Sequence, residues 1–243
     1  MEKRIIGILG GMGPRSTPPF MELVIDQCTV QYGAKYDEDF PPVMVYSLPT
    51  PFYVNRPINH TLMKETIIEG LQKLEATGVS FIVMPCNSAH MYFDELEKCI
   101  NVPLLNNADL TMNSLPPKSK SQRITIFATK ATFASSIYQN AITSAGHKFV
   151  FQKSWQDKIN KIIQMIRAKE NIQKISLYWN ELILEAEKFH IDNIIIGCTD
   201  LSILKSMTES QVNIIDSAEV LAKAAIMRFL YGNSIFSVEA KIL

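Results

Sequence analysis

Short apolar segments alternate with longer amphipathic ones along this chain. Five segments rich in β-branched residues, at 4–9, 43–47, 79–84, 123–128 and 193–197, are predicted strands, apolar enough to be buried on both faces of a sheet. Between them, apolar positions recur with helical spacing. This alternation predicts an α/β fold whose parallel sheets carry helices on both faces.

Two glycines mark where predicted helices end. The helical spacing over 61–77 stops before Gly78, and the spacing over 133–145 stops before Gly146. Glycine closes helices in this way because it adopts the left-handed conformation at little cost.

Polar residues and a proline mark where two further helices begin. Ser16 and Thr17 precede Pro18, and proline suits the first helical turn, where no backbone N–H is needed. Asp216 and Glu219 lie three positions apart, as in a capping box, ahead of a predicted final helix of about fifteen residues.

One segment has the character of a domain boundary. The residues from Leu115 to Ser121 are polar and contain two prolines, and a predicted strand begins at Arg123. We therefore expect two α/β domains of similar size, divided at 115/116. No repeat is visible between their sequences.

Composition and charge exclude several classes of protein. Of the 243 residues, 47% are hydrophobic and 20% are charged, which is typical of a folded chain. Lys and Arg together number 24, as do Asp and Glu, so no net field favours nucleic acid or an anionic membrane. The apolar runs are too short to span a bilayer. The N-terminal run breaks at Gly10 and Gly11 without a cleavage site, so we expect a cytoplasmic protein.

In each half of the chain, an apolar strand leads into a cysteine and two polar residues. These are Cys86, Asn87 and Ser88, and Cys198, Thr199 and Asp200. Ligands of parallel sheets bind beyond the carboxyl ends of the strands, where a helix N-terminus favours a thiolate. Two facing thiols, one of them ionised, could take a proton from one face of a carbon and return it to the other. The polar neighbours could bind a small carboxylate.

Each of these features also has a simpler interpretation. A cysteine in a buried position is ordinarily an inert small hydrophobe, and we interpret Cys28 and Cys99 in that way. The loop over 10–14 has no Gly-Lys-Ser/Thr sequence and no clean GxGxxG pattern, so nucleotide binding is not favoured. Cys86 and His90 are four apart, but no further metal ligands lie nearby in the sequence. We expect no metal and no cofactor.

Three motifs carry a family signature. They are Gly10-Gly11-Met12-Gly13-Pro14, Pro85-Cys86-Asn87-Ser88-Ala89-His90 and Gly197-Cys198-Thr199-Asp200. Together they resemble the aspartate/glutamate racemase family of cofactor-independent amino-acid racemases, and the similarity runs nearly end to end. A cysteine in both of the later motifs is the specific signal.

The resemblance implies two similar Rossmann-like α/β domains related by a pseudo-twofold, with the active site in the cleft between them. The last helix would return to the first domain, so that the domains comprise 1–115 plus 217–243 and 116–216. A homodimer and a small amino-acid substrate are also implied.

Carried over by position, Cys86 and Cys198 would be the acid/base pair acting on aspartate or glutamate. Nine further residues are implied to bind the substrate or line its pocket. They are Met12, Thr50, Asn87, Ser88, Thr129, Thr132, Arg167, Thr199 and Asp200. Arg56 is a second candidate, beside Arg167, for binding a side-chain carboxylate.

Several positions depart from the family pattern. Asp200 replaces a usual glutamate, Ser88 a usual threonine, and Thr50 lies where glutamine is common; Arg15 is also unusual. Two alternatives therefore stay open. One is a related thiol enzyme such as a hydantoin racemase or a maleate isomerase, and the other is a non-catalytic amino-acid-binding protein on the same scaffold.

Overall fold

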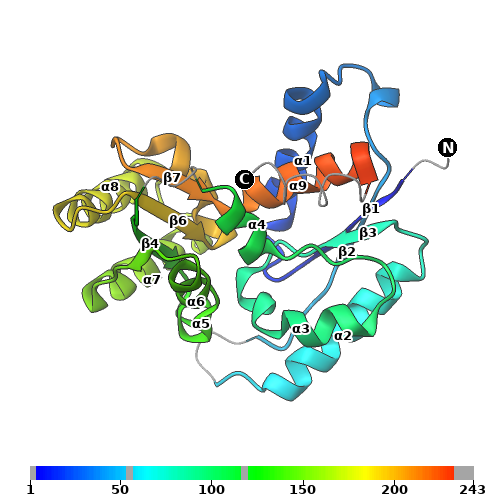
Figure 1. The fold of residues 1–243 in the computed structure, drawn as a ribbon, viewed down its shortest axis with the longest axis horizontal. Helices are drawn as coiled ribbons and strands as arrows, with labels where there is room; N and C mark the ends of the chain where they lie inside the picture. Colours follow the sequence, from blue (N-terminus) through cyan, green and yellow to red (C-terminus); the bar gives the residue numbers. More distant parts are fainter. Residues whose placement is uncertain (1–3, 53–56, 116–119, 233–243) are drawn as a thin grey trace. The chain divides into compact units, whose positions relative to one another are not determined.

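The computed structural model describes residues 4–52, 57–115 and 120–232. Its strands form two sheets, of order β2-β1-β3 and β5-β4-β6-β7, and all their pairings are parallel (Figure 1). The predicted α/β fold with parallel sheets is confirmed. The chain separates into two compact units, unit 1 with Met1–Asn107 and Leu221–Leu243, and unit 2 with Ala108–Val220. The division at 115/116 and 216/217 expected above stays a prediction, and residues 116–119 of its boundary lie outside the described residues.

Unit 1 is built around β1, which pairs with β2 on one side and β3 on the other. Its elements are β1 (Ile6–Gly10), α1 (Thr17–Tyr32), η1 (Asp37–Asp39), β2 (Val43–Ser47), α2 (His60–Glu75), β3 (Phe81–Val83), η2 (Asn87–Tyr92), α3 (Phe93–Leu96) and η3 (Glu97–Cys99). Residues of β1 and β3 are buried throughout. They pack with one face of α2, whose buried positions include Met63, Ile67 and Leu71.

The second strand of unit 1 differs from its prediction. We expected 43–47 to be buried on both faces, but Met44 is 43% and Val45 45% exposed. Within the described residues β2 pairs only with β1, so it forms an edge of the sheet. An apolar run alone does not distinguish an edge strand from a central one, which is why the prediction was wrong here.

Unit 2 has the same order of strands with one more at the end. Its elements are β4 (Arg123–Ala128), α5 (Lys130–Ser135), α6 (Ile137–Ser144), β5 (Lys148–Phe149), α7 (Lys153–Arg167), α8 (Ile172–Lys188), β6 (Asn193–Gly197), η4 (Thr199–Met207) and β7 (Asn213–Asp216). The short strands β5 and β7 were not predicted, because two residues and four residues are too few to show a pattern.

Side chains of β4 and β6 alternate between two hydrophobic clusters. Phe127 and Ile196 pack with Trp155 and Trp179 of α7 and α8. Their neighbours in the strands, such as Ile126 and Ile195, belong to the second cluster, with Tyr138 and Ile142 of α6. Since successive side chains of a strand point to opposite faces, this sheet is covered by helices on both faces, as predicted.

The predicted helix over 133–145 is interrupted. Ser136 has φ 58° and separates α5 from α6, whereas the predicted end at Gly146 is present with φ 76°. Hydrophobic spacing continues across the break, so the sequence pattern does not reveal it. The helix that ends near Gly78 is present as α2, and Gly78 has φ 83°.

A repeat becomes visible when the strands of the two units are matched. Ile82 of β3 bridges Leu104 in parallel, as β6 pairs with β7 in unit 2. The segments that follow are Leu105-Asn106-Asn107-Ala108-Asp109 and Ile215-Asp216-Ser217-Ala218-Glu219. Each leads into a helix, α4 (Asn107–Asn113) or α9 (Ser217–Tyr231). The two segments share one identical residue, alanine, so the correspondence is evident from the strand pairing and not from the sequences alone.

These two helices are the places where the chain changes units. Ala108 of α4 packs in a core cluster of unit 2. The guanidinium of Arg4 donates to the carbonyl oxygen of Phe229 in α9 at 2.7 Å, within unit 1. The predicted cap of α9 is present in part: the Asp216 carboxylate accepts from the Ala218 N–H at 2.8 Å, but Glu219 pairs with Lys205.

Candidate functional site

The Cys86 turn, residues 84–90, follows the buried strand β3 of unit 1. Cys86 is half-buried and extended, with φ −138° and ψ 100°, and it caps the 3-10 helix η2. Its carbonyl oxygen accepts from the Ala89 N–H at 3.1 Å and lies 2.9 Å from Nδ1 of His90. A carbonyl oxygen can only accept, so Nδ1 is the donor. His90 thus orients the backbone of the Cys86 turn.

Asn87, the residue after Cys86, is hydrogen-bonded to a second buried amide, that of Asn107. Asn107 is 1% exposed and donates from Nδ2 to Oδ1 of Asn87, which is 4% exposed, at 3.2 Å. The first residue of α4 therefore holds the amide of Asn87, a predicted substrate-binding residue. Sequence reasoning missed Asn107, which the repeat after Leu104 and Ile214 would have drawn attention to.

The Cys198 turn, residues 197–202, directly follows β6 of unit 2. Cys198 is extended as well, with φ −150° and ψ 119°, and it caps the 3-10 helix η4. Its side chain is more enclosed than that of Cys86, with 7% of the residue exposed. The Leu201 N–H donates to its carbonyl oxygen at 2.9 Å.

Two predicted substrate-binding residues of unit 2 bind each other. Nε of Arg167, at the end of α7, donates to Oδ2 of Asp200 at 2.8 Å. Sγ of Cys198 lies 3.9 Å from the same oxygen and donates to it. A carboxylate paired with a guanidinium thus lies beside one of the two candidate catalytic thiols.

Hydroxyl and amide groups line the neighbouring strand end of unit 2. Thr129 follows Ala128, which is paired in register with Gly197, so Thr129 and Cys198 extend from adjacent strand ends. Oγ1 of Thr129 caps α5 by accepting from the Thr132 N–H at 3.2 Å. Gln156 of α7 donates from Nε2 to the Ala128 carbonyl at 3.1 Å. Sequence reasoning did not single out Gln156.

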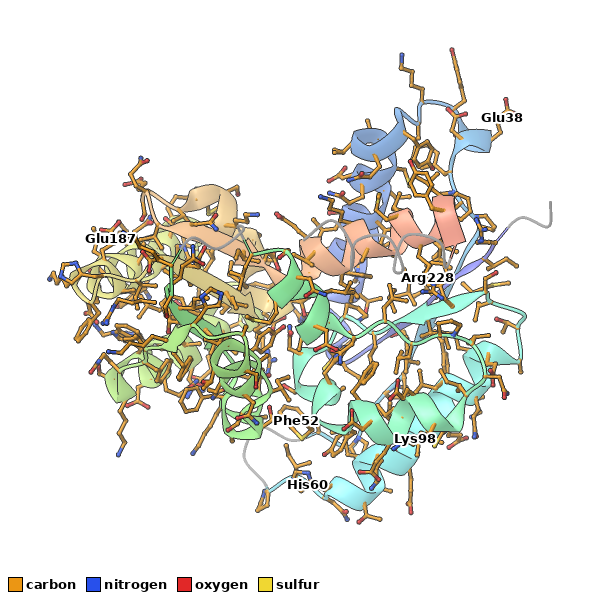
Figure 2. The ribbon with its side chains drawn as sticks, in the orientation of Figure 1. Glu38, Phe52, His60, Lys98, Glu187 and Arg228 are labelled. Carbon is orange, nitrogen blue, oxygen red and sulfur yellow. The ribbon has the colours of Figure 1, made fainter. Side chains whose placement is uncertain are left out.

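Met12 and Thr50 follow the strand ends of β1 and β2 in unit 1. The loop that holds Met12 is tied to α1, because Oγ1 of Thr17 accepts from the Gly11 N–H at 2.8 Å. Thr50 is half-buried, and its carbonyl oxygen accepts from the N–H of Phe52 at 2.8 Å. Phe52 is labelled in Figure 2. Arg56 lies outside the described residues.

The predicted site residues thus gather in two sets, one in each unit. Met12, Thr50 and the Cys86 turn lie at the carboxyl ends of the strands of unit 1. Thr129, the Cys198 turn and its partner Arg167 do so in unit 2. Each unit by itself therefore has the polar strand-end groups expected of a ligand site in a parallel sheet.

The other two cysteines have structural surroundings. Cys28 is buried in α1 and donates to the carbonyl oxygen of Val24, and burial raises the pKa of its thiol. Cys99 donates to the carbonyl oxygen of Glu95 at 3.2 Å. Among residues 4–52, 57–115 and 120–232, no cluster of three metal-binding side chains occurs and no helix could cross a membrane.

The chain is similar to proteins whose names state an activity. The chain matches the sequence family described as Asp/Glu/Hydantoin racemase over residues 9–225. It is 41% identical over 226 residues to a Bacillus subtilis (strain 168) protein named broad specificity amino-acid racemase RacX, across 93% of this chain and 98% of that protein. It is 30% identical over 169 residues to the glutamate racemase of Aquifex aeolicus, across 66% and 65% of the two chains.

Two solved structures show the same fold over most of their length. The aspartate racemase of Picrophilus torridus is 27% identical, with a TM-score of 0.73 over 93% of this chain and 94% of that one. An aspartate racemase homologue from Pyrococcus horikoshii OT3 is 25% identical, with a TM-score of 0.77 over 94% and 99%.

Proposed function

Because this chain belongs to the Asp/Glu/hydantoin racemase family and is an amino-acid racemase, hence an isomerase, we propose that it inverts the α-carbon of its substrates with two cysteines. One thiolate of the pair Cys86 and Cys198 removes the α-proton. The opposite thiol then delivers a proton to the other face of the carbon. The reverse reaction uses the same two groups with exchanged protonation states, and no pyridoxal phosphate is required.

The main support is the equivalence of the two cysteine turns. Both cysteines follow a buried parallel strand, both are extended, and both occupy the N-cap position of a 3-10 helix. A two-base racemase needs one group that exchanges a proton on each face of the substrate, and two thiols in equivalent turns meet this need. We propose that the two thiols act on opposite faces of the same α-carbon.

The polar groups beside the thiols supply the remaining chemistry. Removing the α-proton leaves negative charge on the substrate carboxylate, which becomes enolate-like. Hydrogen-bond donors held at that position stabilise the charge as it develops. The amide of Asn87, held by Asn107, and the hydroxyls of Ser88, Thr129, Thr132 and Thr199 are our candidates for binding the carboxylate and amino groups.

We propose a substrate range that includes aspartate and glutamate without being limited to them. The resemblance implies acidic substrates, and relatives are named glutamate and aspartate racemases. The Bacillus subtilis relative is named for broad specificity. Both observations are met by an enzyme that recognises mainly the backbone groups common to all amino acids.

The test is α-proton exchange. The protein is incubated with the L- and D-enantiomers of a panel of amino acids in D₂O and followed by proton NMR, with a Cys86→Ser/Cys198→Ser double variant as control. We expect both enantiomers of a substrate to lose the α-proton signal as the opposite enantiomer appears. If no amino acid in the panel exchanged, or if the double variant were as active, the proposal would be wrong.

We also propose that the protein is a homodimer, as the resemblance implies. Multi-angle light scattering at micromolar concentration measures this directly, and a mass near the 27.5 kDa of one chain would reject it.

A further inference from the structure

We propose that Asp200 is a built-in counter-ion for Arg167, so that the enzyme accepts neutral and cationic side chains at least as well as acidic ones. The inference rests on the proposed function, and it assigns the substrate class of the same site. Its starting point is the hydrogen bond from Arg167 Nε to Asp200 Oδ2, at 2.8 Å.

The pair lies at the reaction site. Asp200 is two residues after Cys198, and its Oδ2 is 3.9 Å from the thiol sulfur. Arg167 is the last residue of α7. The same helix carries Gln156, whose amide donates to the carbonyl oxygen of Ala128 at the end of β4. Gln156 and Arg167 are eleven positions apart, about three helical turns, so they lie on the same side of α7. This side of α7 therefore follows the strand ends from Thr129 to Asp200.

Arg167 is the charged group of this side that would attract a substrate carboxylate. Two other α7 cations are engaged with α8: Lys158 pairs with Glu185, and Lys161 lies over the ring of Tyr178. The Asp200 carboxylate is largely enclosed, with 13% of its side chain exposed against 39% for Arg167. A carboxylate so enclosed needs an opposite charge. Arg167 supplies it, and the pair is neutral.

An acidic side chain entering beside this pair would meet a carboxylate already bound to the guanidinium. It would have to compete with Asp200 for Arg167 and would experience repulsion from Asp200. An amide or hydroxyl side chain meets no such penalty, and a cationic side chain is attracted by Asp200. The pair therefore removes the charge preference that a lone arginine would impose.

Gln156, on the same side of α7, is fixed at the end of β4. Gln156 Nε2 donates to the Ala128 carbonyl, which can only accept, and this fixes the orientation of the amide. Its Oε1 is buried and has no hydrogen-bond partner within the described part of the chain. Gln156 therefore marks where this side of α7 meets the end of β4, next to the strand that carries Cys198.

The test compares aspartate with asparagine, which share their shape and differ in charge. In the unchanged enzyme, kcat/KM for aspartate should not exceed that for asparagine. Asp200→Asn, which leaves Arg167 without its counter-ion, should raise the aspartate-to-asparagine ratio about tenfold. Arg167→Gln should lower the ratio by a similar factor and should favour lysine over glutamine. The double variant, neutral again, should restore the original ranking.

Glu185→Gln is the matched control. It breaks a different ion pair of α7, the one between Lys158 of α7 and Glu185 of α8, and should leave the aspartate-to-asparagine ratio unchanged. If a variant turns over too slowly, aspartate and asparagine binding is measured by calorimetry in a Cys86→Ser background, where the same ratios are expected. Circular dichroism verifies that each variant is folded.

A strong preference of the unchanged enzyme for aspartate, or single variants that leave the ratio unaltered, would overturn the inference. Absence of α-proton exchange with every amino acid would instead reject the proposed function, so the two failures are distinguishable.

Discussion

The turns that carry Cys86 and Cys198 have the same backbone conformation but differ in the charge of the side chains around them. Both cysteines are extended residues between a buried parallel strand and a 3-10 helix. The polar groups fixed around Cys86 are an imidazole and two amides, whereas Cys198 has the carboxylate of Asp200 beside it. The strand–turn geometry is common to both units, and the side chains at the next few positions make the two thiols chemically different.

The same contrast continues in the second part of the repeat. Asn106 and Asn107 of unit 1 correspond to Asp216 and Ser217 of unit 2. An amide in one unit is thus a buried carboxylate in the other, with Asp216 2% exposed. The comparison teaches that a repeated backbone conformation can hold two cysteines in equivalent places while the side chains around them give the two thiols different surroundings.

Replacing either cysteine is expected to have the largest effect on activity. Cys86→Ser and Cys198→Ser should each lower racemisation at least about 10³-fold, because a hydroxyl is a far weaker acid than a thiol and a two-base reaction needs both groups. Each variant should still exchange the α-proton of one enantiomer, and the two variants should differ in which one. Proton NMR in D₂O and chiral chromatography measure both quantities. Exchange of the same enantiomer by both variants would contradict opposite-face bases.

Converting Asp216 into the residue found in unit 1 tests the electrostatic difference. Burial raises the pKa of Asp216 from 3.8 to about 6, so the folded protein binds this proton more tightly than the unfolded chain. The free energy of unfolding should therefore fall between about pH 4 and pH 6. The total loss is about 3 kcal/mol, at 1.36 kcal/mol per pKa unit.

Asp216→Asn should abolish this fall and make the protein more stable at pH 7 by up to about 3 kcal/mol. The amide oxygen still accepts the Ala218 N–H that the carboxylate accepts now. Urea denaturation at pH 4 and pH 7 measures the difference, and Asp26→Asn, at an exposed position of α1, controls for the loss of one carboxylate. An unchanged pH dependence in Asp216→Asn would refute the assignment.

The first strand of each unit provides a smaller contrast. Gly11 follows β1 with φ 87°, and a Cβ there would lie 2.4 Å from the backbone nitrogen of Leu48. Thr129, after β4, is an ordinary N-cap. Gly11→Ala should lower the free energy of unfolding by about 2 to 3 kcal/mol, and Thr129→Ala by about 1 kcal/mol.

Gly33→Ala is the control for conformational strain alone, because Gly33 has φ 74° and no atom within 4 Å of the added Cβ. Gly33→Ala should lower the free energy of unfolding by about 1 kcal/mol. Equal losses for Gly11→Ala and Gly33→Ala in urea denaturation would show that the close approach to Leu48 carries no energetic weight.

Prediction succeeded where a few neighbouring residues decide the outcome. Strands 123–128 and 193–197 were predicted with the bounds they have, because their runs of β-branched residues are local and long enough to recognise. Cys198 directly follows β6, so its place at a strand end followed from the strand itself. The break at Ser136 and the edge position of β2 depend on packing that no local pattern records.

The sequence by itself determined that this is an α/β protein with parallel sheets and with a cysteine after a buried strand in each half, because hydrophobic periodicity and turn residues act over a few positions. Only the tertiary structure decided that Arg167 binds Asp200, that Asn107 holds Asn87, and that Gln156 turns its amide to the end of β4. These contacts join residues from different elements, and the path of α7 across the strand ends sets which side chains meet.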